Sequence, residues 1–166
     1  MSDKLKMHTP NKADENFAKL AALFPNAVTE TKDEHGDIVR AIDKDILMLT
    51  PVFFETVNEL VRYNITISVS SLKELKLIDK TAKNLNAKAK IQLKINTGMN
   101  RLGFNDNKSI LKALNLVKNS KNLTLTGAFS HFGNVCNKAY TKSQFQKFLN
   151  LTKVIKKDYP KIDYHI

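Results

Sequence analysis

Two stretches of this sequence carry side chains whose types and spacing could do chemistry. The first stretch begins with the predicted strand around residues 89–95. Polar and apolar residues alternate there as they do in a β-strand, so Gln92, Lys94 and Asn96 would share one face. A parallel strand is normally buried on both faces, and three polar side chains on one face then need a partner or a ligand. The alternative is a strand that ends in a solvated lysine.

The residues after this strand could bring a ligand close to the backbone. Gly98 and Gly103 allow tight turns and close approach. Between them, Arg101 offers a rigid fork of hydrogen-bond donors that suits an anionic group. An arginine that only caps a turn is the alternative, and the residues alone leave both interpretations open.

The second stretch runs from Gly127 to Asn134, and His131 directly follows a predicted strand. Catalytic and cofactor-contacting residues occupy this position in parallel sheets, although a single histidine can equally be structural. Ser130 and His131 cannot form a catalytic pair, because neighbouring strand residues point to opposite faces. The sequence has no nucleophile elbow, dinucleotide fingerprint, Walker A loop or metal-site spacing.

The elements that must position these residues alternate regularly between residues 46 and 166. Short β-branched or apolar runs predict strands at 46–49, 65–69, 89–95, 123–129 and 162–166. Helical spacing predicts helices at 53–61, 71–85, 107–119 and 141–157, the second with a capping box of Ser71 and Glu74. Such alternation predicts a parallel sheet, either doubly wound or part of an eight-stranded barrel.

The first 45 residues have a different character. They hold seven basic and nine acidic residues, whereas residues 46–166 hold twenty and seven. An amphipathic helix is predicted at 13–24, followed by a hairpin whose strands lie around 27–29 and 38–40. We therefore expect two parts, residues 1–45 and residues 46–166.

Composition narrows the class of protein. The chain has no apolar run long enough to span a membrane and no apolar signal region, so we expect a cytoplasmic protein without a membrane partner. Its single cysteine, Cys136, cannot form an intramolecular disulfide. The net charge of +11 comes mainly from lysines on the polar faces of predicted helices. This pattern favours solvated faces over a nucleic-acid site, and no metal site is predicted.

Taken together, the two stretches resemble a known family. The run from Lys94 to Gly103 is similar to the K-x-D-T-G-M-x-R-x-G signature of alanine racemases, and Gly127–Phe132 is similar to their G-x-x-T/S-H-F segment. The resemblance covers about residues 46–166. It implies an α/β fold, a partial (β/α)8 TIM-type barrel with about five parallel strands, and binding of pyridoxal 5′-phosphate.

The resemblance also implies roles for individual residues. The residue matching Lys94 is often carbamylated and orients the one matching Arg101, which meets the phenolic oxygen of the cofactor. His131 would lie against the pyridine ring, and His165, in a segment similar to the start of H-x-A-N-S, would belong to the same surroundings. Asn96 and Asn100 depart from the family pattern, which usually has Asp and often Gly there.

Two catalytic parts of the family have no counterpart in these residues. No K-A-x-A-Y-G segment supplies the Schiff-base lysine, and no residue matches the tyrosine of the C-terminal domain. No catalytic residue is therefore assigned. We expect a truncated or fused protein related to isomerases that supply D-alanine for peptidoglycan. By itself, the chain is expected to racemise alanine slowly or not at all. The family forms homodimers.

Residues 1–45 show a second resemblance. Asp14–Phe17, Leu23–Glu30 and Ala41–Asp43 are similar to the N-terminus of the methyltransferase subunit of type III restriction–modification systems. None of the catalytic motifs of a methyltransferase is present. A DNA-associated basic protein derived from such a subunit is the alternative function, and a non-catalytic barrel that binds pyridoxal phosphate is a third.

Overall fold

The structure is a computed structural model, and it describes residues 28–32, 38–42 and 45–166. The chain divides into two compact units, with the boundary between Ile46 and Leu47.

The described part of the first unit is an antiparallel pair of strands. β1 (Val28–Lys32) pairs with β2 (Ile38–Ile42), with Val28 opposite Ile42 and Lys32 opposite Ile38. The predicted hairpin strands are thereby confirmed. The helix predicted at 13–24 and the turn between the strands lie outside the described residues.

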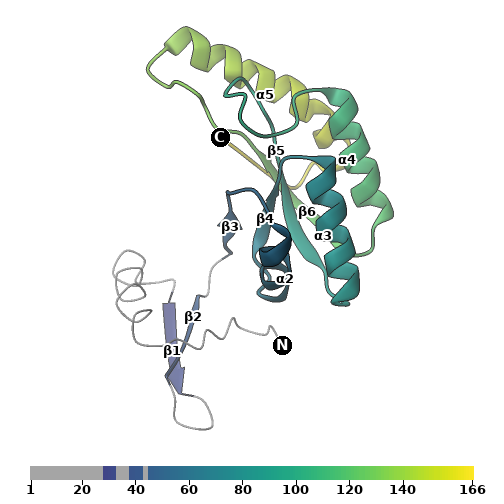
Figure 1. The fold of residues 1–166 in the computed structure, drawn as a ribbon. Helices are drawn as coiled ribbons and strands as arrows, with labels where there is room; N and C mark the ends of the chain where they lie inside the picture. The colour runs from purple at the N-terminus through teal and green to yellow at the C-terminus, as the bar shows by residue number, and fades with distance from the viewer. Residues whose placement is uncertain (1–27, 33–37, 43–44) are drawn as a thin grey trace. The chain divides into compact units, whose positions relative to one another are not determined.

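The second unit is built from five parallel strands joined by helices (Figure 1). The strands are β3 (Leu47–Met48), β4 (Thr66–Val69), β5 (Ala89–Lys94), β6 (Leu123–Phe129) and β7 (Asp163–His165). The helices between them are α2 (Phe54–Arg62), α3 (Leu72–Asn84), α4 (Asn107–Asn119) and α5 (Lys138–Asp158). Every predicted strand and helix of this part is therefore present, with boundaries that shift by a few residues.

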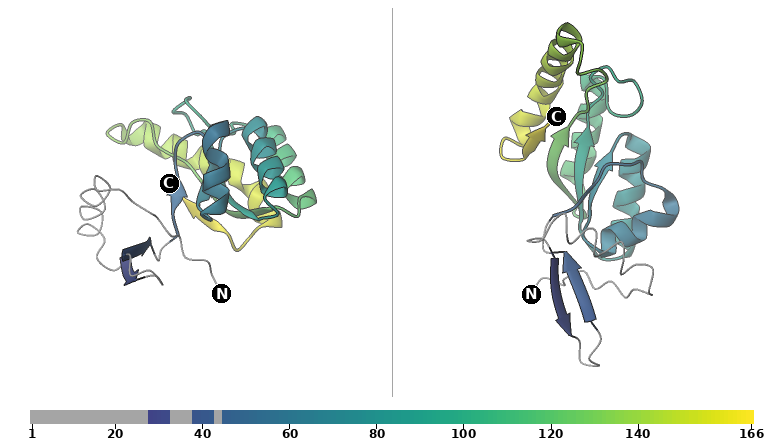
Figure 2. Two further views of the ribbon diagram at one scale, coloured as in Figure 1. Left: turned by 60° about the horizontal axis from the view of Figure 1, so that its bottom comes forward. Right: turned by 90° about the vertical axis from the view of Figure 1, so that its left-hand side faces the viewer.

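The order of the strands decides between the two architectures that the sequence left open. The sheet runs β3-β4-β5-β6-β7, so each strand is added beside the one before it in the chain. Crossovers between parallel strands are right-handed. Because each new strand is added on the same side of the previous one, all four helices lie on one face of the sheet. Figures 1 and 2 show α2, α3, α4 and α5 following one another around the outside of the strands. The unit is a half-barrel and not a doubly wound sheet.

The hydrophobic core lies between the strands and these helices. Ile91 and Leu93 of β5 are fully buried, as are Leu75 of α3 and Ile110 of α4. The other face of the sheet carries polar residues, including Ser68 and Gln92, which are also buried. In a (β/α)8 barrel this face would point to the interior, so the polar layer lies at the centre and the apolar layer beneath the helices.

Polar side chains fix where the helices begin. Ser71 Oγ accepts a hydrogen bond from the Glu74 backbone N–H, as the predicted capping box requires. The return bond differs, because Glu74 accepts from the N–H of Ser70 at 2.6 Å instead of that of Ser71. Asn137 caps α5, which therefore begins three residues before the predicted Thr141. In the described part of the chain, no helix is long and apolar enough to cross a membrane.

Candidate functional site at the carboxyl ends of β5 and β6

Lys94 occupies the carboxyl end of β5 and is only 7% exposed. Its Nζ lies 5.6 Å from the centre of the Phe129 ring, on the neighbouring strand. Burial lowers the pKa of the Lys94 ammonium, the nearby Arg101 charge lowers it further, and Glu74 partly offsets both. The neutral amine of Lys94 is therefore populated at lower pH than that of an ordinary lysine.

The loop from Asn96 to Phe104 folds back onto the strand that it leaves. Asn96 Oδ1 accepts the N–H groups of Gly98 and Asn100, each at 3.1 Å, and its Nδ2 donates to Asn100 Oδ1. Phe104 N donates to Lys94 O at 2.9 Å, and Asn96 N donates to Phe104 O at 2.8 Å. Asn96, which the sequence predicted to need a hydrogen-bond partner or a ligand, therefore has its partners within this loop.

Two positions in the loop need an unusual backbone. Asn100 has a φ of 56°, a left-handed conformation that asparagine tolerates better than most residues. Gly103 has a φ of 116°, and a Cβ there would lie 2.8 Å from Lys94 O and 2.9 Å from Asn96 N. Both backbone features lie beside Arg101, so they set the direction from which its side chain leaves the loop.

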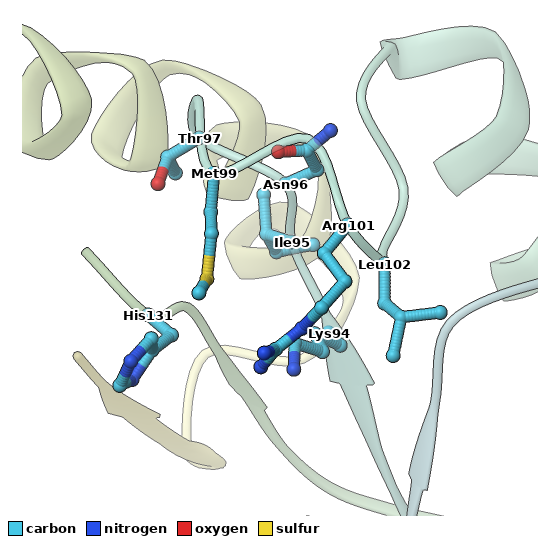
Figure 3. Close-up of a pocket in the computed structure, with 8 residues that line it drawn as sticks. All are labelled: Lys94, Ile95, Asn96, Thr97, Met99, Arg101, Leu102 and His131. Atoms are coloured by element: carbon cyan, nitrogen blue, oxygen red, sulfur yellow. The ribbon is translucent and has the colours of Figure 1, made fainter. Parts of the chain in front are cut away.

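The side chains of Arg101 and Lys94 end close together, and His131 lies across from them on the loop after β6 (Figure 3). Asn96 points away from these side chains in the same view. Two adjoining hollows, the larger of about 550 Å³, are both lined by Lys94, Arg101, Leu102 and His131. The side chains predicted from two separate stretches of sequence therefore lie around one site.

Ser130 has a structural role beside the site. Its side chain is buried, its Oγ donates to Ile95 O at 2.9 Å, and it lies 2.8 Å from Thr97 Oγ1. His131, the next residue, is exposed and faces the hollows. The expectation that these neighbours do not act as a pair agrees with this geometry.

His165 lies apart from the other three predicted site residues. It stacks on Phe129, with ring centres 5.3 Å apart and planes at 8°, and its Nε2 is 2.8 Å from Gln92 Oε1. His165 lines neither of the two hollows, and Phe129 lies between it and Lys94 along the register of the strands. Phe129 was not predicted as a site residue, because its position in an apolar strand gives no such signal.

Helix α5 contributes two residues that the sequence did not single out. Tyr140 donates its hydroxyl to Gly98 O at 2.8 Å, and buried Gln144 accepts the N–H of Gly133 at 3.2 Å. The helix thus holds the loops that carry Arg101 and His131. A signal existed for Gln144, since it is a polar residue at helical spacing with the apolar Phe148 and Leu151.

The site is cationic. Lys94 and Arg101 supply positive charge, His131 supplies an imidazole, and no acidic residue is among the described residues that line the two hollows. Guanidinium and ammonium groups that converge at the carboxyl ends of parallel strands suit an anionic oxygen of a ligand. The donors therefore fit a small molecule that carries anionic oxygens.

Comparison with known proteins places this arrangement in a family. A model of the N-terminal domain of alanine racemase matches residues 14–165 of the chain. The chain belongs to this family. Its members depend on pyridoxal phosphate. The matched range includes both strands of the hairpin, and the resemblance of residues 1–45 to a methyltransferase stays a prediction.

The alanine racemase of Methanococcus maripaludis is 36% identical over 105 residues, which are 62% of this chain and 28% of that protein. The alanine racemase of Lactobacillus gasseri is 32% identical over 126 residues, or 74% of this chain and 34% of that protein. The chain thus spans about a third of the length of these relatives.

Solved structures show the same half-barrel. Alanine racemase from Clostridium difficile, in complex with cycloserine, superposes with a TM-score of 0.69 at 28% identity over 75% of this chain and 35% of that one. The enzyme from Streptomyces coelicolor superposes with a TM-score of 0.61 at 23% identity, over 74% of this chain and 33% of that one, which shows the shared fold. The predicted fold class, a partial barrel of about five parallel strands, is confirmed.

Proposed function

We propose that residues 46–166 form part of the cofactor site of an alanine racemase, with Lys94, Arg101 and His131 around pyridoxal phosphate and His165 in the same surroundings, on the far side of Phe129 from Lys94. The observation that carries this proposal is the convergence of Lys94, Arg101 and His131 on one site at the strand ends. Membership of the alanine racemase family supports the identity of the ligand.

Each residue would act through its own chemistry. Arg101 is exposed, and its side chain forms no ion pair within the described part of the chain, so its donors are available to an anionic oxygen. Lys94 adds positive potential as an ammonium. In its neutral form, which the lowered pKa favours, it can instead be carbamylated as the family resemblance implies, and it then no longer carries a positive charge. His131 presents an exposed imidazole that can lie against an aromatic ring.

When bound, pyridoxal phosphate would supply an electron sink for chemistry at the substrate Cα. The residues of this chain would hold and orient that cofactor. Racemisation also needs a base on each side of Cα, and none of the 166 residues matches the two bases of the family. Alanine as substrate, a homodimer and a cytoplasmic place in D-alanine supply belong to the same proposal. The chain by itself is then a cofactor-binding part with little or no racemase activity.

Pyridoxamine 5′-phosphate is a suitable probe, because it has the ring and phosphate but no aldehyde that could react with surface lysines. We expect saturable binding to the 166-residue chain by isothermal titration calorimetry. Arg101→Gln should weaken it about 10-fold or more, since a charge-assisted hydrogen bond contributes about 1.5–3 kcal/mol. Supplied with pyridoxal phosphate and L-alanine, the chain should form D-alanine no faster than free pyridoxal phosphate.

Lys112→Gln is the matched control, because Lys112 lies on α4 beside a different hollow and its replacement removes the same charge. Binding that falls equally in both variants would show a general charge effect and overturn the proposed site. Rapid formation of D-alanine would overturn the limit on activity while leaving the site in place.

A further inference from the structure

The side chain of Gln92 reaches across an entire strand. Gln92 belongs to β5, and its Oε1 lies 2.8 Å from Nε2 of His165 on β7. These strands do not pair with each other, because β6 lies between them. Neighbouring strands are about 4.8 Å apart, so the contact bridges roughly 10 Å of sheet. A residue between the two ends must leave room for it.

Gly127 of β6 provides that room. In the register of the sheet Gln92 lies opposite Gly127, and Gly127 lies opposite Asp163. A Cβ at Gly127 would lie 2.8 Å from Cδ and 2.9 Å from Nε2 of Gln92, closer than such atoms can approach. Any other residue at 127 would therefore occupy the space that the Gln92 amide crosses.

This contact favours a hydrogen on Nε2 of His165. An amide oxygen only accepts hydrogen bonds, so with Oε1 of Gln92 facing the ring we assign Nε2 of His165 as the donor. Stacking on Phe129 fixes the plane of the ring, and the bond from Nε2 fixes its rotation within that plane. In the neutral ring, Nδ1 is then left with a free lone pair.

We propose that Gln92 is a positioning residue, which acts through the gap at Gly127 to hold His165 in one orientation as the Nε2–H tautomer. His165 would thereby present an acceptor at Nδ1 to the cofactor surroundings. The link to the cofactor rests on the proposed function, whereas the hold on His165 does not. Gln92 lies outside both hollows, and its side chain hydrogen-bonds to His165.

Nitrogen NMR of the histidine-labelled 166-residue chain tests the hold directly, at a pH where the ring is neutral. The His165 signals are assigned by their loss in His165→Gln. The wild-type spectrum should show the Nε2–H tautomer, and the Nδ1–H form there would overturn the proposal without any further variant. Gln92→Leu should give a mixture of tautomers, and an unchanged spectrum would overturn it as well. Gln92→Glu keeps an acceptor in place and should restore the Nε2–H form.

Gln146→Leu is the matched control, since Gln146 is exposed on α5 and the same change is made there away from His165. Binding of pyridoxamine 5′-phosphate should weaken about 2- to 10-fold in Gln92→Leu, as expected for one lost hydrogen bond, and recover in Gln92→Glu. If the probe does not bind the wild-type chain, the proposed function fails, while the histidine spectra still decide the role of Gln92.

Discussion

The Lys94 ammonium is poorly reached by water, and the nearby Glu74 carboxylate only partly offsets the cost of burying its charge. The Phe129 ring gives it some compensation, since a cation over an aromatic face is stabilised by the charge distribution of the ring. Burial and the neighbouring Arg101 both lower the pKa of its ammonium. The folded state therefore favours the neutral amine more than the unfolded state does, and folding and protonation of Lys94 oppose each other.

This opposition predicts a pH dependence of stability. Between the lowered pKa of the folded chain and the ordinary lysine value of 10.5, the unfolded state binds more protons. The contribution of Lys94 to the free energy of unfolding should therefore rise with pH across that window. At neutral pH, Lys94→Met should be about as stable as wild type or more stable by roughly 1 kcal/mol.

Urea unfolding of both proteins near neutral pH and at about pH 10 measures this difference. The advantage of Lys94→Met should shrink at the higher pH. Lys112→Met, at a lysine on the outer surface, should show no such change. An advantage that grows with pH would contradict the assigned direction of the pKa shift.

At the scale of elements, the loop after β5 is held by both backbone and side-chain contacts. Gly103 lies against the carbonyl of Lys94 and the N–H of Asn96, and the next residue, Phe104, bonds to both. Helix α5 adds one tie through Tyr140 to Gly98, and the buried pair of Thr97 and Ser130 adds another. The loop is therefore a fixed part of the half-barrel, and this fixed loop determines where the backbone of Arg101 lies.

Gly103→Ala should disrupt this arrangement. The added Cβ would clash with two backbone atoms, which cannot rotate away, and a φ of 116° is strained for alanine. We expect a loss of about 1–3 kcal/mol in the free energy of unfolding. Gly133→Ala is the matched control, because the nearest atom to its Cβ lies 3.5 Å away, and it should change stability by less than about 0.5 kcal/mol. Equal losses in both variants by urea denaturation would refute the close-approach argument.

At the scale of the whole second unit, the sheet has two strands that pair on one side only. β3 and β7 are the end strands in the described order, and end strands with free backbone groups promote association. Leu49, which follows β3, is 56% exposed, and Ile166, which follows β7, is 43% exposed. Within the described residues, an exposed apolar side chain therefore follows each end strand of the sheet.

We expect the 166-residue chain to self-associate with rising concentration in sedimentation velocity experiments. Leu49→Lys places a charge beside the β3 edge and should weaken the association. Leu111→Lys makes the same change at a residue of α4 that is 50% exposed, on the outer side of the half-barrel, and should leave it unchanged. A chain that stays monomeric at all concentrations would show that the edges are protected.

The local pattern of the sequence determined most of the elements and the residues of the site. Alternation along β5 placed Gln92 and Lys94 on one face, and the capping residue Ser71 and the helical spacing after it located α3. The two stretches at the ends of β5 and β6 already pointed to Lys94, Arg101 and His131 by residue type and spacing. These features depend on neighbours within a few residues, and such information is written directly in the chain.

Only the tertiary structure decided which side chains meet. Periodicity could not distinguish a doubly wound sheet from a half-barrel, because that choice depends on the order in which strands pair. The bond from Gln92 to His165 joins residues 73 positions apart and depends on the missing side chain of Gly127 on a strand between them. The separation of His165 from the other predicted site residues has the same origin, because the register of three strands, and not any local pattern, places Phe129 between His165 and Lys94.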